Sequence, residues 1–241
     1  MAIGGGHARL FHGHAAKTAV KKTADKTPRA RPARAPAAKA APRRGRPPAN
    51  VADKRAAIVA AARAVFARHG LESASMRLIA SEAGVAAPTL YLYFKGAEEL
   101  YGAALSASLA ELGAALAGAP AVPGDARAHA AAVTRAFFDF YYTRPDDAAL
   151  GLYLNRGLGP RGLNPELDAR LNRELLAAIK LLTQALGALH GYSARQAATA
   201  SFALASACMG VAIFHHTRRD KSLHVDAQAA FEQLLGWVFR A

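Results

Sequence analysis

Residues 75–94, SMRLIASEAGVAAPTLYLYF, decide the fold. Ser75 is a good N-cap for a short helix, because its hydroxyl can accept a hydrogen bond from a backbone N–H of the first turn. Gly84 then starts a turn, and a second helix is predicted over 87–94. Pro88 costs nothing in the first turn of that helix, because the N–H that proline lacks would have no partner there. Two helices joined by so tight a turn predict a helix-turn-helix, in which the second helix enters the major groove of DNA.

On both sides of this segment, apolar side chains recur at helical spacing. A first helix is predicted from Asp53 to a stop at Gly70, and a long helix from near Gly96 to Leu116. Hydrophobic residues make up 52% of the chain and aromatic residues only 7%, so most of the apolar content is Ala and Leu, which favour helices over sheets. Further helices are predicted at 126–142, 145–155, 165–190, 193–218 and 225–240. The sequence therefore predicts an all-α fold, with a three-helix N-terminal domain followed by a helical C-terminal domain.

Positive charge is concentrated in residues 1–50. The whole chain has 31 Lys and Arg against 17 Asp and Glu, and residues 1–50 hold twelve of the basic residues and one acid, Asp25. So strong an excess points to a polyanionic partner such as DNA. The segment is too rich in Ala, Pro and charge to bury a core, so we expect a disordered basic tail. For residues 1–40, a passive solubilising tail or a misassigned start is an equal alternative.

An Arg-Gly-Arg-Pro arm at 44–47 lies just ahead of the predicted DNA-binding domain. Such a segment is extended and flat enough to enter a narrow minor groove, where A·T-rich DNA concentrates negative potential. N-terminal arms in this position reach the minor groove beside the site that the helix reads. We therefore expect Arg44 and Arg46 to contact DNA.

The residues around the helix-turn-helix are more specific than its spacing. They are AARAVFARHG at 61–70, IASEAGV at 79–85, PTLYLYFK at 88–95 and EEL at 98–100. Together they resemble the DNA-binding domain of the TetR family over residues 53–105. The resemblance implies an all-helical repressor in which the first three helices hold DNA, the fourth links them to the body, and the last two build the dimer. The C-terminal part matches the family only in the number and length of its helices.

Carried over position by position, the resemblance implies a set of DNA contacts. Tyr91 and Tyr93 occupy positions where the family touches phosphate with an aromatic residue or histidine. Ser75 and Lys95 are also suited to phosphate, and Arg77 matches a position that can reach a base edge. The exposed tip of the recognition helix consists of Ala87, Pro88, Thr89 and Leu92. The residues interpreted as core instead are Phe66, Ile79, Leu90 and Phe94.

Direct hydrogen-bond readout should be thin, because Thr89 is the only hydrogen-bonding side chain at this tip. We therefore expect specificity to rest on Arg77, on apolar contacts with thymine methyl groups, and on minor-groove shape sensed by Arg44 and Arg46. The sequence also departs from the family, which often has a capping Ser, a polar or basic residue, and a Lys at the positions of Ala86, Ala87 and Ala97.

Five aromatic residues fall within 137–142, more than one helix stripe needs for its core. Apolar walls with a few hydroxyl groups suit a cavity for a drug-sized or lipid-like molecule, which would be a small apolar effector. For each single residue, ordinary core packing remains the alternative. The candidate lining residues are Phe137, Phe138, Tyr141, Tyr142, Tyr153, Phe202, Met209 and Phe214.

No charged residue occurs from Ala197 to Phe214, a length that raises the question of a membrane span. Ala, Ser, Thr and Gly make up most of it, so transfer into lipid would be poor, and we expect no membrane role. Small residues let helices approach closely, so we expect this segment and the last helix to form a four-helix interface in a homodimer. The last helix would contribute Phe231, Leu234, Leu235, Trp237 and Val238. Two-fold symmetry then predicts a pseudo-palindromic operator.

Catalysis finds little support in the sequence. His215 and His216 are adjacent and point to different sides of a helix, and no Gly-rich phosphate loop or metal-spaced triplet occurs. We expect no enzyme activity, no metal and no cofactor. The single cysteine, Cys208, and the lack of a secretory signal fit the cytoplasm.

The predicted organisation has three parts: a tail, a helix-turn-helix domain, and an effector-binding and dimerisation domain, at 1–50, 51–96 and 97–241. The predicted function is a DNA-binding transcriptional regulator, a repressor that a small apolar effector releases from double-stranded DNA. The alternative is a sequence-tolerant DNA-coating protein that is driven by the basic tail and has no effector.

Overall fold

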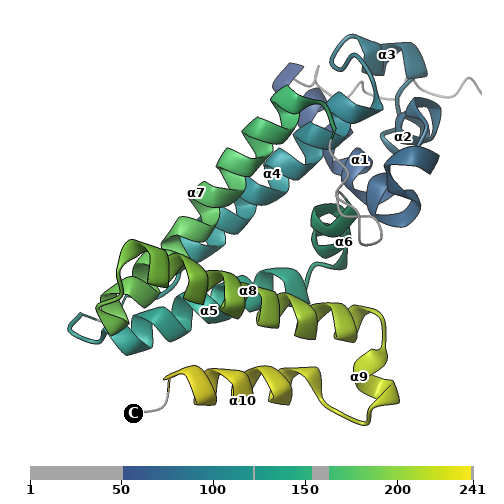
Figure 1. Cartoon of the computed structure of the whole chain (residues 1–241). Coiled ribbons are helices and arrows are strands. Elements are labelled where there is room, and N and C mark those ends of the chain that lie inside the picture. The colour runs from purple at the N-terminus through teal and green to yellow at the C-terminus, as the bar shows by residue number, and fades with distance from the viewer. Residues whose placement is uncertain (1–50, 122, 154–162, 240–241) are drawn as a thin grey trace, which may run out of the picture. The chain divides into compact units, whose positions relative to one another are not determined.

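The computed structural model describes residues 51–121, 123–153 and 163–239, apart from the side chain of Tyr153. All regular structure within these ranges is helical, which confirms the predicted all-α class (Figure 1). The helices are α1 (Val51–Ser73), α2 (Met76–Glu82), α3 (Ala87–Tyr91), α4 (Ala97–Ala117), α5 (Ala126–Tyr142), α6 (Pro145–Tyr153), α7 (Pro165–His190), α8 (Ala194–His216), α9 (Arg219–Ser222) and α10 (Ala227–Phe239). They belong to one compact unit, in which we call α1–α3 the head and α4–α10 the body.

The head packs three short apolar faces against one another. Gly70 interrupts α1 with a φ of 71°, as its place after the apolar repeat predicts, and Gly84 turns the chain between α2 and α3 with a φ of 66°. Both angles lie in the left-handed region, which glycine adopts without the steric cost of a Cβ. The head residues that are at most 2% exposed are Ile58, Ala62, Val65, Phe66, Ile79, Ala80, Leu90 and Phe94. The core interpretation of Phe66, Ile79, Leu90 and Phe94 is therefore confirmed.

In the body, α4 and α7 run side by side and parallel from the head (Figure 1). Gly102 allows the close approach, because a Cβ at this position would lie only 3.1 Å from Cδ2 of Leu167. Further along the pair, a Cβ at Gly113 would lie 4.0 Å from that of Ala178. In both places, the residue on α4 and the residue it faces on α7 are separated by the same number of positions in the sequence. This constant separation shows that the two helices are parallel.

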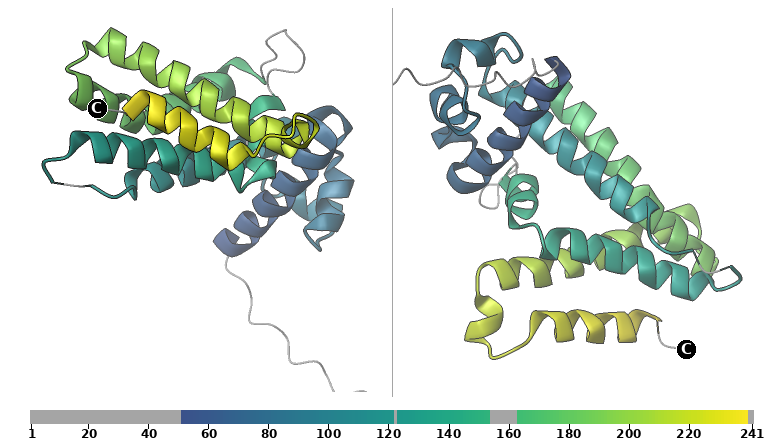
Figure 2. Two further views of the ribbon diagram at one scale, coloured as in Figure 1. Left: turned by 90° about the horizontal axis from the view of Figure 1, so that it is seen from below. Right: turned by 180° about the vertical axis from the view of Figure 1, so that it is seen from behind.

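The remaining long helices form the base of the body. α8 packs antiparallel to α7, where the hydroxyl oxygens of Thr183 and Ser201 lie 2.8 Å apart. α8 also packs against α5, and α10 lies along the outer side of α5 and α8 (Figure 2). A reciprocal capping box between Ser193 and Gln196 fixes the start of α8.

Three details differ from the sequence prediction. α3 ends at Tyr91 instead of Phe94, although the N–H groups of Tyr93 and Phe94 still bond to the carbonyl of Leu90 and so hold Phe94 in the core. The short helix α9 was not predicted. α10 begins at Ala227 instead of Val225, because the Asp226 carboxylate accepts a hydrogen bond from the N–H of Ala229 at 2.8 Å. The end of the helix predicted at 145–155 lies outside the described residues.

Candidate DNA-binding surface and effector site

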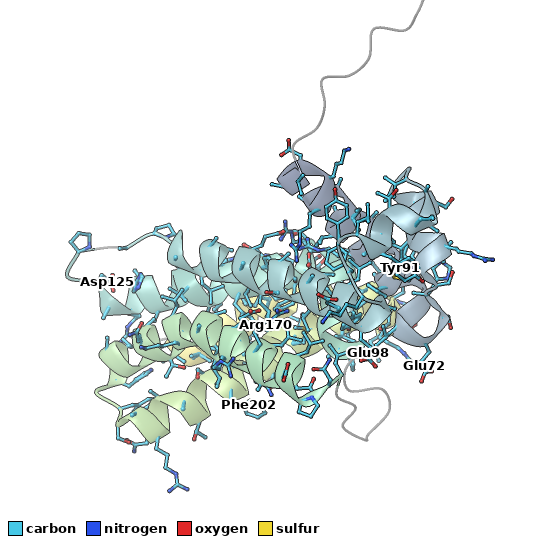
Figure 3. The ribbon with its side chains drawn as sticks, turned by 90° about the horizontal axis from the view of Figure 1, so that it is seen from above. Glu72, Tyr91, Glu98, Asp125, Arg170 and Phe202 are labelled. Carbon is cyan, nitrogen blue, oxygen red and sulfur yellow. The ribbon has the colours of Figure 1, made fainter. Side chains whose placement is uncertain are left out.

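The outer face of the recognition segment is apolar and exposed. Leu90 and Phe94 fix the segment to the head core, whereas Tyr91 is 58% exposed and Leu92 81% exposed. Figure 3 locates Tyr91 in the head, away from Phe202 of the body. Pro88 is exposed as well, and the predicted tip residues Ala87 and Thr89 are half-buried.

The predicted polar DNA contacts that the structure describes also belong to the head. Ser75 caps α2, accepting a hydrogen bond from the N–H of Leu78 at 3.1 Å, and its hydroxyl proton can still be donated to a phosphate. Arg77 and Lys95 are exposed, and Tyr93 is half-buried against the core. The two arm residues Arg44 and Arg46 lie outside the described residues.

A polar network joins the head to the body. Arg63 of α1 donates two hydrogen bonds to the carboxylate of Glu111 on α4, at 2.8 and 3.2 Å. The same carboxylate accepts a hydrogen bond from Arg144, directly ahead of α6, at 2.6 Å. Asp147, in the first turn of α6, is only 3% exposed; it accepts a hydrogen bond from Ser108 at 2.6 Å and lies 3.4 Å from Nη1 of Arg63. We call these five residues the α1–α4–α6 network.

The network stabilises the charged carboxylates of Glu111 and Asp147 where α1, α4 and α6 meet. The hydrogen bonds from Arg63 lower the pKa of Glu111 from its ordinary value of 4.5, although burial opposes the shift. Asp147 also benefits from the positive end of the α6 dipole. Sequence reasoning missed this network, because Arg63 and Asp147 lie far apart in the chain. The Pro145-Asp146-Asp147 start of α6 was the available signal.

A second link between the same three helices passes through Tyr101 of α4. Its hydroxyl donates a hydrogen bond to the carbonyl of Leu150 on α6. Its ring packs edge-on against Phe66 of α1, with the ring centroids 5.0 Å apart. Both links join α1 to α4 and α6, so the position of the head depends on how α4 and α6 sit together.

Most of the predicted pocket aromatics form a packed cluster on α5. Phe137, Phe138 and Tyr141 are buried, and Phe138 stacks on Phe231 of α10 with centroids 3.8 Å apart. Burial raises the pKa of Tyr141 to about 12. Tyr142 is half-buried and stacks on the ring of His215.

The other predicted pocket residues do not all join this cluster. Met209 is half-buried against the core, but Phe202 is 73% exposed and Phe214 is 52% exposed on α8. The side chain of Tyr153 lies outside the described residues. Phe202 and Phe214 therefore do not line an enclosed cavity within a single chain.

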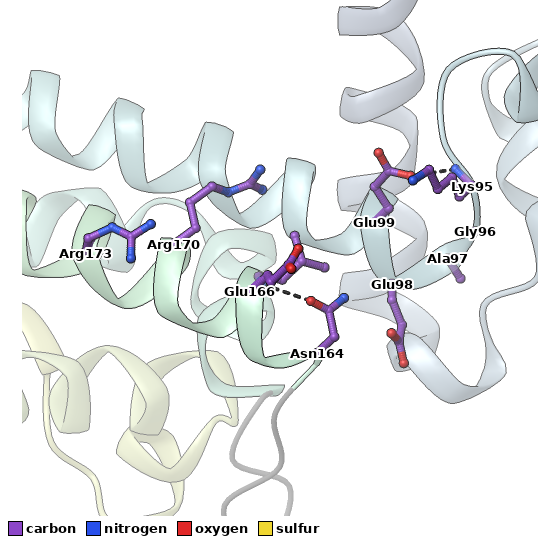
Figure 4. A pocket seen from close by; sticks show the side chains of 10 residues that line it. Lys95, Gly96, Ala97, Glu98, Glu99, Asn164, Glu166, Arg170 and Arg173 are labelled. Carbon is purple, nitrogen blue, oxygen red and sulfur yellow. Dashed lines mark hydrogen bonds between the residues drawn. The ribbon is translucent and has the colours of Figure 1, made fainter.

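Three clefts among the described residues lie elsewhere. A polar cleft of about 700 Å³ lies between the start of α4 and the start of α7 (Figure 4), and a neighbouring cleft of about 500 Å³ lies between α1 and α4. Both are bordered by Glu99 and Arg170. A third, apolar groove of about 400 Å³ lies among α7, α8 and α10, between Tyr192 and Val238. None of the predicted pocket residues borders these three cavities.

One face of α8 is uncharged and open to solvent. Phe202 and Phe214 lie on this face with the exposed Ala203 and Ser206 between them. α4 and α8 are both long and apolar enough to cross a membrane, but 56% of the apolar window of α4 is buried, as in a core helix, against only 28% for α8. On α10, Trp237 is 68% exposed. α8 and α10 thus expose large apolar side chains to solvent.

Polar contacts anchor the end of α8 to its neighbours. Nδ1 of His215 lies 2.9 Å from the carboxylate of Asp220, and Nε2 of His216 lies 2.8 Å from the carbonyl oxygen of Tyr141 on α5. The hydrogen bond with His215 lowers the pKa of Asp220. Within the described part of the chain, no group of three or more His, Cys, Asp or Glu side chains is placed to hold a metal ion.

Comparison with known proteins finds a sequence model that matches part of the chain and solved structures with a similar fold. The sequence model of the bacterial regulatory proteins of the tetR family matches residues 58–104. Among curated proteins, none matches the sequence significantly. A bacterial regulatory protein of the tetR family from Rhodococcus RHA1 shares the fold with a TM-score of 0.62 and 22% identity, over 78% of this chain and 95% of its own.

Two solved regulators of fatty acid metabolism are similar in fold as well. The transcriptional regulator FadR from Bacillus subtilis, in complex with stearoyl-CoA, has a TM-score of 0.59 at 20% identity, over 77% of this chain and 97% of its own. The fatty acid degradation regulator FadR from Bacillus halodurans has a TM-score of 0.57 at 21% identity, over 77% and 94%.

The two kinds of likeness cover different parts of the molecule. The matched residues 58–104 run from α1 through the helix-turn-helix into α4, and they contain the Arg63 anchor of the network. The structural likeness extends through the body, where identities of 20–22% establish the fold alone. The chain therefore carries the DNA-binding helix-turn-helix domain of the TetR family of bacterial regulatory proteins, on the fold of TetR-family transcription regulators.

Proposed function

We propose that the chain is a homodimeric transcriptional repressor, which binds a pseudo-palindromic operator through α3 and leaves it when a small apolar effector binds the body. The observation that carries this proposal is the α1–α4–α6 network. Because Arg63 bonds the DNA-binding head to Glu111 and Asp147, an effector that moves α4 or α6 also moves the head. Such an effector must bind the released arrangement more tightly than the DNA-bound one.

On DNA, the contacts would divide into positioning and reading. Ser75, Tyr91, Tyr93 and Lys95 would hold phosphates, which fixes the register without reading sequence. Arg77, Ala87, Pro88 and Thr89 would face base edges in the major groove, and Arg44 and Arg46 would enter the adjacent minor groove. The cytoplasm, where such DNA is found, would be the place of action.

The dimer would form through α8 and α10. The exposed face around Phe202 and Phe214, together with Trp237, supports this assignment, because a monomer that left these rings in water would forgo the free energy of burying them. We therefore propose that Phe202 and Phe214 belong to the subunit interface and not to the effector pocket. The α5 aromatics and Met209 remain the proposed pocket walls.

The effector would have to open its own space among the α5 aromatics. Phe138 and Phe231 stack at 3.8 Å, so a ligand entering between α5 and its neighbours must separate packed rings. A pocket that forms on binding would transmit the displacement to α6, which follows α5 directly. Stearoyl-CoA, the ligand bound by the structurally similar FadR of Bacillus subtilis, is a suitable first probe because its acyl chain is apolar.

The experiment that tests the proposal compares DNA from directly upstream of the gene with random DNA of equal length, at near-physiological salt. The full chain and a version lacking residues 1–40 should both prefer the upstream DNA, with two chains per site. Lys95→Ala should weaken binding, whereas Lys180→Ala, at an exposed position on α7, should not. Equal binding to both DNAs that disappears with the tail would overturn the proposal and favour the DNA-coating alternative.

A further inference from the structure

Leu92 is the most exposed large apolar side chain in the described part of the chain. Its exposure is 81%, although its backbone is fixed in a helical conformation as the C-cap of α3. Its N–H bonds to the carbonyl of Thr89, and the buried Leu90 and Phe94 hold the chain on either side of it. Leu92 is therefore held outward on a rigid support.

The chain on either side of Leu92 is uncharged as far as Glu82 and Lys95. Residues 83–94 contain no Asp, Glu, Lys or Arg, and the nearest acid before them, Glu82, is 2.8 Å from Arg68 in an ion pair. Pro88 lies one helical turn before Leu92 and is exposed as well. The two side chains form an apolar ridge on the surface that the proposed function turns toward DNA.

In the major groove, few chemical groups can contact such an apolar ridge favourably. Adenine, guanine and cytosine present only hydrogen-bond donors and acceptors there, whereas thymine adds a 5-methyl group. A leucine pressed against a donor or acceptor strips it of water and gives no bond in return, which costs free energy. Against a methyl group the same leucine gains from burial.

We propose that Leu92, supported by Pro88, is a specificity-determining residue that reads thymine 5-methyl groups, so each operator half-site carries thymine at the base step facing Leu92. This assignment rests on the proposed function, because it needs α3 in the major groove. Selection against G·C pairs follows from the same contact, without a hydrogen-bonding side chain.

The test first selects binding sites for the full chain from a pool of random DNA duplexes. In the selected consensus, each thymine is then replaced by uracil, which removes the methyl group and leaves every hydrogen-bonding group in place. At the thymine facing Leu92, uracil should weaken binding about fourfold per half-site, the effect of one buried methyl group. A C·G pair there should weaken binding further, and 5-methylcytosine should recover part of the loss.

Two variants test whether Leu92 causes the discrimination between thymine and uracil. Leu92→Ala should bind thymine and uracil sites equally, and because the side chain is exposed, the thermal midpoint of the protein should not change. Leu176→Ala, at a 68% exposed leucine on α7, should keep the full discrimination.

The outcomes separate the two proposals. A selection without any consensus would overturn the proposed function, and the methyl assignment with it. A clear consensus in which no uracil weakens binding would overturn the methyl assignment alone. Discrimination that survives in Leu92→Ala would show that another residue reads the methyl group.

Discussion

Ala86 begins α3 without a side-chain cap, and its backbone already has the extended conformation of an N-cap, with φ of −72° and ψ of 142°. Because Pro88 has no N–H, the hydroxyl of a serine at position 86 would accept a hydrogen bond from the N–H of Thr89. Ala86→Ser should therefore raise the free energy of unfolding by about 1 kcal/mol, as measured by chemical denaturation at fixed protein concentration. Ser75→Ala, which removes the existing cap of α2, should lower it by a similar amount. An unchanged stability of Ala86→Ser would mean that the first turn of α3 gains nothing from a cap.

At the scale of single residues, the sequence predicts what depends on neighbours in the chain. The cap at Ser75 and the stop at Gly70 are local events, so residue type and position were enough to predict them. The exposure of Phe202 was not predictable in this way. A phenylalanine in an uncharged helix fits a pocket, a core or an interface equally well, and only the packing of α8 against α5 and α7 determines which face is left open.

Among the elements, the junction of α1, α4 and α6 depends on the buried carboxylate of Asp147. Asp147→Asn would leave Arg63 and Arg144 with Glu111 as their remaining acidic partner, and a half-buried guanidinium without its counter-charge is costly. We expect the free energy of unfolding to fall by about 2–3 kcal/mol in denaturant titrations, toward the low end for a broken buried pair, because Glu111 stays. Asp146→Asn is the matched control, since its exposed carboxylate shares the first turn of α6. Equal losses from both variants would assign the effect to the helix dipole and not to the network.

The same junction should give the protein a pH dependence. Because the folded-state pKa of Glu111 is below its ordinary value of 4.5, its stabilisation is complete above that value and is lost as the pH falls toward the folded-state pKa. Between about pH 6 and about pH 3, Glu111→Gln should therefore lose less stability than the unaltered protein. Asp220 titrates in both proteins and cancels in the difference. Glu98→Gln, at an exposed glutamate, controls for the loss of a surface charge, and a Glu111→Gln curve parallel to that of the unaltered protein would exclude Glu111 as the source.

Helices were predicted well from the sequence because each carries its own period and its own ends. The sequence did not predict α9, since its four residues have no apolar repeat and it begins after Arg218, whose positive φ of 58° no local signal announces. Nor did it predict the α1–α4–α6 network, because pairing Arg63 with Asp147 requires the chain to bring α1 beside α6. The helices could thus be predicted from the local sequence, whereas the contacts that join them depend on the tertiary structure.

For the whole molecule, the proposed dimer gives a small head its specificity for the operator. Once one head binds its half-site, the linked second head is held at a high effective concentration near the other half-site, which raises the affinity for the complete operator. Phe202→Asp places a charge in the exposed apolar face of α8. If a partner buried this face, the charge would lose its contact with water and would have no counter-charge. We expect this variant to sediment as a monomer at concentrations where the unaltered protein is a dimer, and to lose operator affinity while its helical content remains. Val51→Asp, at a similarly exposed apolar position at the start of α1, should leave the dimer intact. If Phe202→Asp stayed dimeric, the apolar face of α8 would lie outside the interface, and its exposure would have to be explained by another partner.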